Sequence, residues 1–286
     1  MYAFKFCPIV RVIRLRALIT GFDVVRPKGY HFSGEMHNFW EAVCVAEGTA
    51  TATADGRVYT LKSGDLLFHK PMEFHRIAAA EDKPVRLLIL SFDADGEIME
   101  RFKNGLFKLD RFKLYRFSTL CRRAERVIHA EKSENEEKYA FESSRTAADF
   151  EQFMLDIIKD RSSETHEDAR YADVYREIVG FMESHCNESM TVSAIAKGCN
   201  LSESNLKRIF KIFCDRGVIE YHNFLRIRKA MEMLEKGTTA AVISDTLGFS
   251  DVSYFYVAFK RETGLTPRGY VRSLQKTSNA SFENSL

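Results

Sequence analysis

The chain has 286 residues, of which 45% are hydrophobic and 29% charged, the composition of a globular protein long enough for two domains. It contains no run of the roughly 18–20 apolar residues that a membrane-spanning helix needs, and its first residues lack the apolar core of a secretion signal. Its six cysteines stand singly, without zinc-finger or C-x-x-C spacing. We therefore expect a cytoplasmic protein with reduced thiols and no membrane partner.

The net charge of +2 is unevenly distributed. Between residues 189 and 276, 14 Lys and Arg outnumber 8 Asp and Glu, whereas residues 1–188 are slightly acidic. A basic C-terminal third fits a module that binds a polyanion. Many surface helices have a similar excess of basic residues, so charge alone does not establish that this region binds a polyanion.

Residues 1–95 are expected to form a β-barrel. Alternation of apolar and basic residues over 1–20 predicts one or two edge strands. Five short strands separated by turn signals follow, over residues 41–46, 50–54, 58–61, 66–68 and 86–92. Asp55-Gly56 predicts a tight hairpin, because such a turn needs residues that tolerate positive φ. Regularly spaced short strands are typical of a small barrel or sandwich.

Residues 96–160 follow a helical period instead. Apolar residues recur there at the spacing of a helix–helix seam: Ala147, Phe150, Phe153, Met154, Ile157 and Ile158. The seam can pack against the barrel of its own chain or form a subunit interface, and the spacing alone does not choose between them. The polar stretch at 161–171 is expected to be a linker.

Residues 172–276 are expected to be helical, with residues 277–286 as a flexible tail. Thr191 and Ser202 are placed to cap two short helices, and Thr239 and Ser250 cap a second pair about 48 residues later. Each pair predicts a helix-turn-helix, whose second helix enters the major groove of DNA. A helix over 218–236, roughly 28 Å long, would separate the two units. Neighbouring major-groove faces lie roughly 34 Å apart, so one chain could reach both.

Several motifs in this region resemble the DNA-binding domain of AraC-type regulators over about 174–273. They include Leu206-Lys207-Arg208-Ile209-Phe210-Lys211, Gly248-Phe249-Ser250-Asp251 and Gly264-Leu265-Thr266-Pro267. The Gly64-Asp65 turn and the Pro71…His75 spacing resemble the cupin-like sensor barrel of the same family over about 25–95. The resemblance implies a two-domain α+β fold: a cupin-like β-barrel with a helical dimerisation hairpin, then an all-α double helix-turn-helix. It also implies a homodimer, with double-stranded DNA, a small-molecule effector and RNA polymerase as partners.

The resemblance also implies which residues face DNA. The groove-facing positions fall on Ser204, Asn205, Lys207 and Arg208 in the first unit, and on Val252, Ser253, Tyr256 and Val257 in the second. We add Lys211, Lys260 and Arg261 as contacts to phosphates. The alternative for each basic residue is a solvated helix face.

This sequence departs from the family pattern at two positions. Asp215 stands where a glycine usually ends the first recognition helix, and Val257 stands where a basic residue is common. No Arg or Lys occurs from Asp251 to Ala258. We therefore expect Lys207 and Arg208 to read bases, and the second unit mainly to anchor the protein.

For the effector site we expect His37, Phe39, Trp40, Glu41 and His75, with the aromatic residues stacking on a ligand that could be sugar-like. Trp40 could equally be a core residue. His37, Glu41 and His75 could also form a metal-binding triad, because cupin enzymes bind metal through histidines and a glutamate on these strands. In the remaining alternative, His69 and His75 only satisfy backbone groups.

We expect no metal and no cofactor, since sensors of this family generally bind organic effectors. The sequence therefore predicts a DNA-binding transcription regulator that is not an enzyme. A cupin-type metal-dependent enzyme and a regulator without effector control remain the alternatives.

Overall fold

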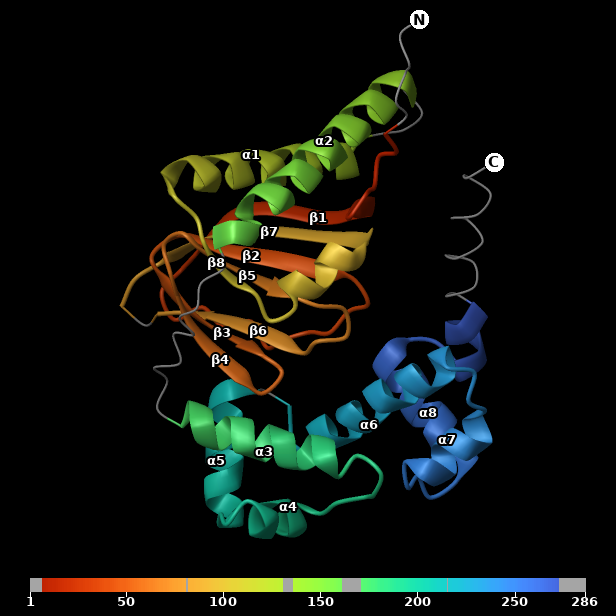
Figure 1. Cartoon of the computed structure of the whole chain (residues 1–286). Helices are drawn as coiled ribbons and strands as arrows, with labels where there is room; N and C mark the ends of the chain where they lie inside the picture. The colour runs from red at the N-terminus through yellow and green to blue at the C-terminus, as the bar shows by residue number, and fades with distance from the viewer. Residues whose placement is uncertain (1–6, 81, 131–135, 161–170, 215, 273–286) are drawn as a thin grey trace, which may run out of the picture. The chain divides into compact units, whose positions relative to one another are not determined.

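The computed structural model of the chain divides into two compact units, Met1–Arg170 and Tyr171–Leu286 (Figure 1). The described residues are 7–80, 82–130, 136–160, 171–214 and 216–272. The expected tail and all but the last residue of the expected linker lie outside them. Strands occur in the first unit and helices alone in the second, which confirms the expected two-domain α+β architecture. None of the described helices is both long and apolar enough to cross a bilayer.

The strands of the first unit form two antiparallel sheets. They are β1 (Arg14–Arg26), β2 (Trp40–Glu47), β3 (Thr49–Ala54), β4 (Arg57–Lys62), β5 (Asp65–His69), β6 (His75–Ala79), β7 (Val85–Asp95) and β8 (Leu106–Lys108). The larger sheet has the order β1-β7-β2-β5-β8, and the smaller has the order β4-β3-β6. Asp55-Gly56 joins β3 to β4 as predicted, with Asp55 at φ 50°.

The eight strands differ in how clearly the sequence predicts them. The five predicted central strands correspond to β2, β3, β4, β5 and β7, and the N-terminal alternation corresponds to the single strand β1. Strands β6 and β8 were not predicted. The reason is their composition: β6 contains one large aliphatic residue, Ile77, and β8 is only three residues long. Their pairing partners decide that they are strands.

The larger sheet is covered on both faces. Val45, Leu67 and Leu87 pack in one apolar cluster with residues of the smaller sheet, such as Ala52 and Tyr59. The alternate residues of the same strands pack in a second cluster with the helices: Ala42, Cys44, Leu66, Phe68, Leu88, Leu90 and Phe92. Strand β2 is therefore buried on both faces, which explains its nearly continuous apolar sequence.

Two helices cover the outer face of the larger sheet (Figure 1). They are α1 (Arg111–Ile128) and α2 (Glu136–Ile157), with short 3-10 helices at η1 (Glu97–Phe102) and η2 (Ile158–Asp160). Asp110 begins α1 by accepting a hydrogen bond from the Lys113 backbone N–H at 2.8 Å. Residues 96–160, which the sequence predicted to be helical, also contain the short strand β8.

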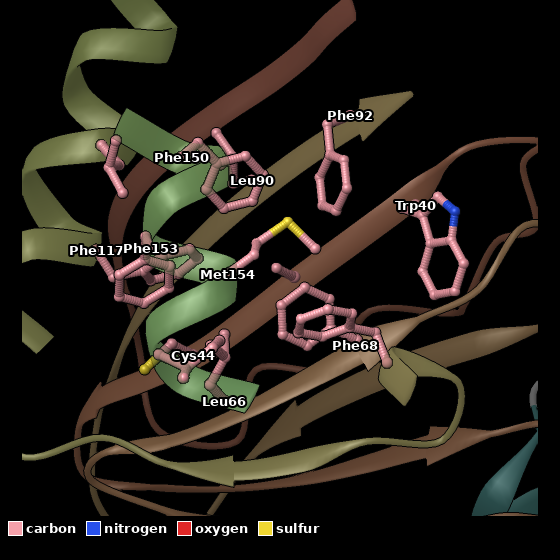
Figure 2. Packing of buried hydrophobic residues seen from close by; sticks show 14 of the residues in the cluster. Trp40, Cys44, Leu66, Phe68, Leu90, Phe92, Phe117, Phe150, Phe153 and Met154 are labelled. Carbon is pink, nitrogen blue, oxygen red and sulfur yellow. The ribbon is translucent and has the colours of Figure 1, made fainter. Parts of the chain in front are cut away.

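The apolar seam of α2 packs inside its own chain. Phe150, Phe153, Met154 and Ile157 are fully buried in one cluster with Phe117 of α1 and strand residues of the larger sheet. Figure 2 shows Phe150, Phe153 and Met154 on the same side of the sheet as Phe117 and Leu90. These four seam residues pack within their own chain, which favours the intrachain alternative, whereas Ala147 and Ile158 of the seam are only partly buried.

The second unit consists of helices α3 (Ala172–Ser184), α4 (Val192–Gly198), α5 (Glu203–Phe213), α6 (Val218–Glu235), α7 (Ala240–Thr246) and α8 (Val252–Thr263). Residues 267–272 are also helical. The predicted caps Thr191, Ser202 and Thr239 precede α4, α5 and α7. The predicted N-cap Ser250 is wrong by one residue. Asp251 caps α8 and accepts a hydrogen bond from the Tyr254 backbone N–H.

Strand β1 approaches α1 most closely at Gly21. A Cβ at this position would lie 2.6 Å from the Cys121 carbonyl oxygen and 2.8 Å from the Glu125 backbone nitrogen. Both are backbone atoms of the helix, so they cannot swing aside as a side chain can. The absence of a side chain at residue 21 is therefore what allows helix and sheet to touch.

We expect Gly21→Ala to lower the free energy of unfolding of the first unit by about 1–3 kcal/mol, the usual cost of overpacking a core. Urea denaturation followed by circular dichroism measures it. Gly180→Ala is the matched control, because nothing lies within 4 Å of a Cβ there. That change should be neutral or stabilising, since alanine favours a helix over glycine by about 1 kcal/mol. Equal stability of the Gly21→Ala variant and the unchanged protein would contradict the close-contact argument.

Candidate functional site

The first helix-turn-helix consists of α4 and α5. Ser202 caps α5 by accepting a hydrogen bond from the Asn205 backbone N–H at 3.2 Å. One face of α5 is buried through Leu206, Ile209, Phe210 and Phe213. The predicted DNA contacts Ser204, Lys207, Arg208 and Lys211 are exposed, and Asn205 is half-buried. Helix α5 therefore presents a polar, basic face to solvent.

Arg208 is held in place on this face. Its Nη2 donates a hydrogen bond to Asn205 Oδ1 at 2.7 Å, and its guanidinium carbon lies 4.7 Å from the centre of the Tyr171 ring. The Lys207 ammonium lies 3.7 Å from the Glu203 carboxylate. The contacts with Asn205 and Tyr171 limit the orientations of the Arg208 guanidinium. This reduces the side-chain entropy that is lost when Arg208 binds a base.

The second helix-turn-helix consists of α7 and α8, and its exposed face is of a different kind. Val252, Ser253, Tyr256 and Val257 are all exposed, Val257 to 64%. The basic residues Lys260 and Arg261 come later on the same helix and are also exposed. An apolar face of this kind can contact thymine methyl groups, whereas it offers no charged donor to a guanine.

Helix α6 joins the two helix-turn-helix motifs, and a buried arginine on it contacts the second motif. Its 18 residues span about 27 Å at 1.5 Å per residue. Arg226 of α6 is 2% exposed and donates to the Leu247 carbonyl oxygen from both Nε, at 3.0 Å, and Nη2, at 2.8 Å. Leu247 ends α7, so the guanidinium satisfies a free carbonyl at a helix C-terminus. The same group lies 4.0 Å from the centre of the Phe249 ring.

A second polar contact directly links the two helix-turn-helix motifs. Arg216, in the turn after α5, pairs with Glu262 of α8 at 2.7 Å, and the Glu262 side chain is only 6% exposed. Tyr270 donates to Glu235 at 2.6 Å and so fastens residues 267–272 to the end of α6. These contacts hold the recognition helices α5 and α8 in a defined arrangement.

The predicted sensor residues of the first unit fall into two places. His37, Glu41 and His75 come together: Glu41 Oε1 lies 3.3 Å from His75 Nε2, and Glu41 Oε2 lies 3.8 Å from His37 Nε2. Phe39 belongs to the same cluster, with its ring stacked 3.8 Å from that of His37. Glu41 and His75 are buried, and His37 is half-buried.

Trp40 lies elsewhere. Successive residues of a strand point to opposite faces, so Trp40 packs in the outer cluster while Glu41 points to the inner face. Figure 2 shows its ring on the side of the sheet that carries Phe68 and Phe92. It is 4% exposed. The prediction that Trp40 stacks on an effector is therefore corrected, and the alternative of a core residue applies.

Electrostatics hold a charged pair inside this cluster. Burial by itself would raise the pKa of Glu41, but its contacts with His37 and His75 hold that pKa well below the usual range. Burial would lower the pKa of His75, and the nearby Glu41 raises it above the ordinary value instead. Burial lowers the pKa of His69, which bonds to Glu73 at 3.0 Å. The arrangement favours an ionised Glu41 beside a protonated His75.

Sequence reasoning missed several of these residues. Glu35 lies 3.9 Å from His75, and only its position two residues before His37 hinted at a role. Tyr171 and Arg226 gave no signal, because an aromatic residue in a linker and an arginine on a helix are both ordinary. Asp215 lies outside the described residues.

A cavity of about 560 Å³ between β1 and the helices, lined in part by Leu18, Ile128 and Tyr139, includes none of the predicted effector residues.

Comparison with protein families gives two matches. The AraC-like ligand binding domain matches residues 24–172, more than half of the chain, and a helix-turn-helix domain matches residues 195–273. The two together cover both units and include every predicted site residue.

Among curated proteins, the chain is similar to the Msm operon regulatory protein of Streptococcus mutans, with 32% identity over 130 residues. That match covers 45% of each chain, so the chain spans less than half of this relative. It is also 24% identical over 247 residues to the HTH-type transcriptional activator RhaS of Escherichia coli, covering 83% of this chain and 86% of RhaS.

Among solved structures, ToxT from Vibrio cholerae aligns with 89% of this chain and 96% of its own, at 14% identity and a TM-score of 0.38. The C-terminal domain of AraT, a response regulator from Geobacillus stearothermophilus, aligns with 37% of this chain and 88% of its own. Its identity is 26% and its TM-score 0.35.

Proposed function

Because this chain belongs to the AraC family of transcription regulators, with a ligand-binding domain followed by a helix-turn-helix DNA-binding domain, we propose that it binds specific DNA sites under the control of a small-molecule effector. The observation that carries this proposal is the pair of helix-turn-helix units joined by α6, with the basic face of α5 exposed. The fold alone would suit other activities, so the proposal depends on that face.

We propose unequal roles for the two recognition helices. Arg208 is the main base-reading residue, because arginine fits the O6 and N7 acceptors of guanine and this one is already oriented by Asn205 and Tyr171. Lys211 and Lys260 have no ion-pair partner among the described residues, so their charges are available for phosphates. Helix α8 supplies apolar contacts through Val252 and Val257.

The effector site that we propose is the polar cluster of the first unit. His37, Glu41 and His75 are polar groups that converge in the interior of the first unit, and polar groups at such positions commonly orient a ligand. Effector binding there would favour one arrangement of domains or subunits over another, which changes the DNA sites that can be occupied together.

We propose that two chains associate through the outer face of α1, in place of the buried α2 seam. Phe112 and Tyr115 are 69% and 66% exposed, and with Thr119, Arg122 and Arg126 they follow a spacing of three and four residues. That spacing is typical of a helix that pairs with another helix. Since the relative RhaS is a transcriptional activator, RNA polymerase is also among the proposed partners.

Selection of genomic DNA fragments by the purified protein tests the proposed function. We expect enrichment of fragments that share one motif, in two parts about one helical turn apart. Recovery of fragments without a shared motif would contradict sequence-specific binding. Repeating the selection with metabolite mixtures shows whether the bound set depends on an effector.

Arg208→Ala should weaken binding to the selected site by roughly 5- to 150-fold, equivalent to about 1–3 kcal/mol, and relax the preference at one base pair. Lys260→Ala should weaken all sequences alike and lower the slope of log affinity against log salt by about 1. Fluorescence anisotropy at several salt concentrations measures both effects.

Lys236→Ala, at the exposed end of α6, removes the same charge and serves as the control for a general electrostatic effect. The proposed division of roles is wrong if Lys260→Ala changes base preference or Arg208→Ala leaves it intact.

The double change Phe112→Asp and Tyr115→Asp should convert a dimer into a monomer, since it places charges on the apolar part of the proposed interface. Sedimentation velocity measures the change. Phe141→Asp alters an equally exposed aromatic residue on α2, at 64% exposure, and should leave the dimer unchanged. A dimer that survives the double change places the interface elsewhere.

A further inference from the structure

Four side chains that can bind a metal ion converge in the first unit. Glu35 and His37 precede β2, Glu41 lies on β2, and His75 begins β6. Each offers one ligand atom, and these four atoms all lie within 4.8 Å of one another. The two strands belong to different sheets, so an ion here would bridge the sheets.

The two histidines are oriented as metal ligands are. His37 Nδ1 lies 2.9 Å from the Phe39 carbonyl oxygen, and His75 Nδ1 lies 3.0 Å from the Glu73 carbonyl oxygen. A carbonyl oxygen can only accept, so each Nδ1 carries the proton, and in the neutral ring Nε2 keeps a lone pair. Metal-bound histidines are typically fixed in this way by a carbonyl or carboxylate at the other nitrogen.

In the neutral rings, the Nε2 lone pairs lie close to the carboxylates of Glu41 and Glu35, to which they cannot donate a hydrogen bond. His37 Nε2 and His75 Nε2 are buried, and neither has a hydrogen-bond partner among the described residues. A buried polar atom without a hydrogen bond destabilises the folded state, so a ligand that engages both atoms removes this cost. The fixed ring orientations make a single ion the simplest such ligand.

The spacing of the ligand atoms also fits an ion. Bonds of about 2.1 Å place neighbouring ligand atoms about 3.0 Å apart in an octahedral site and about 3.4 Å apart in a tetrahedral one. The observed separations are 3.3 Å from His75 Nε2 to Glu41 Oε1, 3.8 Å from His37 Nε2 to Glu41 Oε2, and 3.9 Å from His75 Nε2 to Glu35 Oε1. Shifts of less than 1 Å would close these pairs around one ion.

The Glu41 carboxylate is held in place by hydroxyl groups of neighbouring strands. Ser91 Oγ donates to Glu41 Oε2 at 2.9 Å, and Thr20 Oγ1 lies 2.6 Å from Ser91 Oγ. These hydroxyls fix the position of the carboxylate, in the manner of the outer partners of metal-bound carboxylates. The carboxylate also brings the negative charge that a buried cation needs.

We propose that His37, Glu41 and His75, with Glu35 as a fourth ligand, bind one divalent transition-metal ion. Two imidazole nitrogens and two carboxylate oxygens suit Zn²⁺, Fe²⁺, Co²⁺ or Ni²⁺. Ca²⁺ and Mg²⁺ prefer oxygen ligands alone, and Cu⁺ prefers sulfur. This proposal departs from our expectation from the sequence that the sensor holds no metal.

The test uses the full chain, freed of metal with a chelator and dialysed. Titration with Co²⁺, followed by visible absorption, and with Zn²⁺, followed by calorimetry, should each give one tight site per chain. Excess Mg²⁺ or Ca²⁺ should not compete. These measurements use no DNA, so their outcome is independent of whether the proposed DNA binding is correct.

Two asparagine substitutions are designed to remove only the ligand atom. In His37→Asn and His75→Asn, the amide nitrogen can still donate to the carbonyl oxygen that Nδ1 now contacts, while Nε2 is lost. Each should lower metal affinity more than about 100-fold, beyond the roughly 10- to 100-fold typical of changes to outer partners. His31→Asn, at an exposed histidine of the same domain, is the matched control and should leave affinity unchanged.

Circular dichroism and thermal unfolding show whether each variant folds. If His75→Asn fails to fold, the half-buried His37→Asn still decides the question. The proposal is overturned if the metal-free chain takes up no Co²⁺ or Zn²⁺, if both asparagine variants keep full affinity, or if His31→Asn loses it to the same extent.

Discussion

The larger sheet of the first unit has two apolar faces, and covering both of them is the constraint on which that unit depends. Every strand of that sheet alternates its side chains between the two sides. One side needs the smaller sheet and the other needs α1 and α2, so the helices are part of the core and not an appendage. The same alternation separates neighbours of different function: Trp40 stabilises the helical side, while Glu41 faces the polar cluster.

The DNA-binding unit depends on a different kind of contact. Two of its helices, α4 and α7, have only seven residues each, too few to be stable alone. Arg226 joins α6 to the end of α7, and Arg216 joins the turn after α5 to α8. These polar contacts fix α5 and α8 relative to each other, which the proposed division of roles between the two recognition helices requires.

The polar cluster between the two sheets of the first unit is where both the proposed effector site and the proposed metal site lie. Burying a carboxylate among apolar side chains is costly unless it is paired, and Glu41 is paired with histidines and a serine hydroxyl. The cluster therefore tolerates its burial, while His37 Nε2 and His75 Nε2 have no hydrogen-bond partner among the described residues. This is why the proposed metal or effector site is placed at this cluster and not in an apolar pocket.

The sequence by itself determined the elements whose signals are local. Caps at Thr191 and Ser202, the Asp55-Gly56 turn and the apolar periods of β2 and α2 each depend on a few neighbouring residues, as do the exposed positions of α5. Only the tertiary structure decided what each apolar face packs against, that β6 and β8 are strands, and that Glu35 joins His37, Glu41 and His75. The reason is physical: strand pairing, the partner of a helix seam and the convergence of distant side chains are set by contacts between residues far apart in the chain, and no local pattern records them.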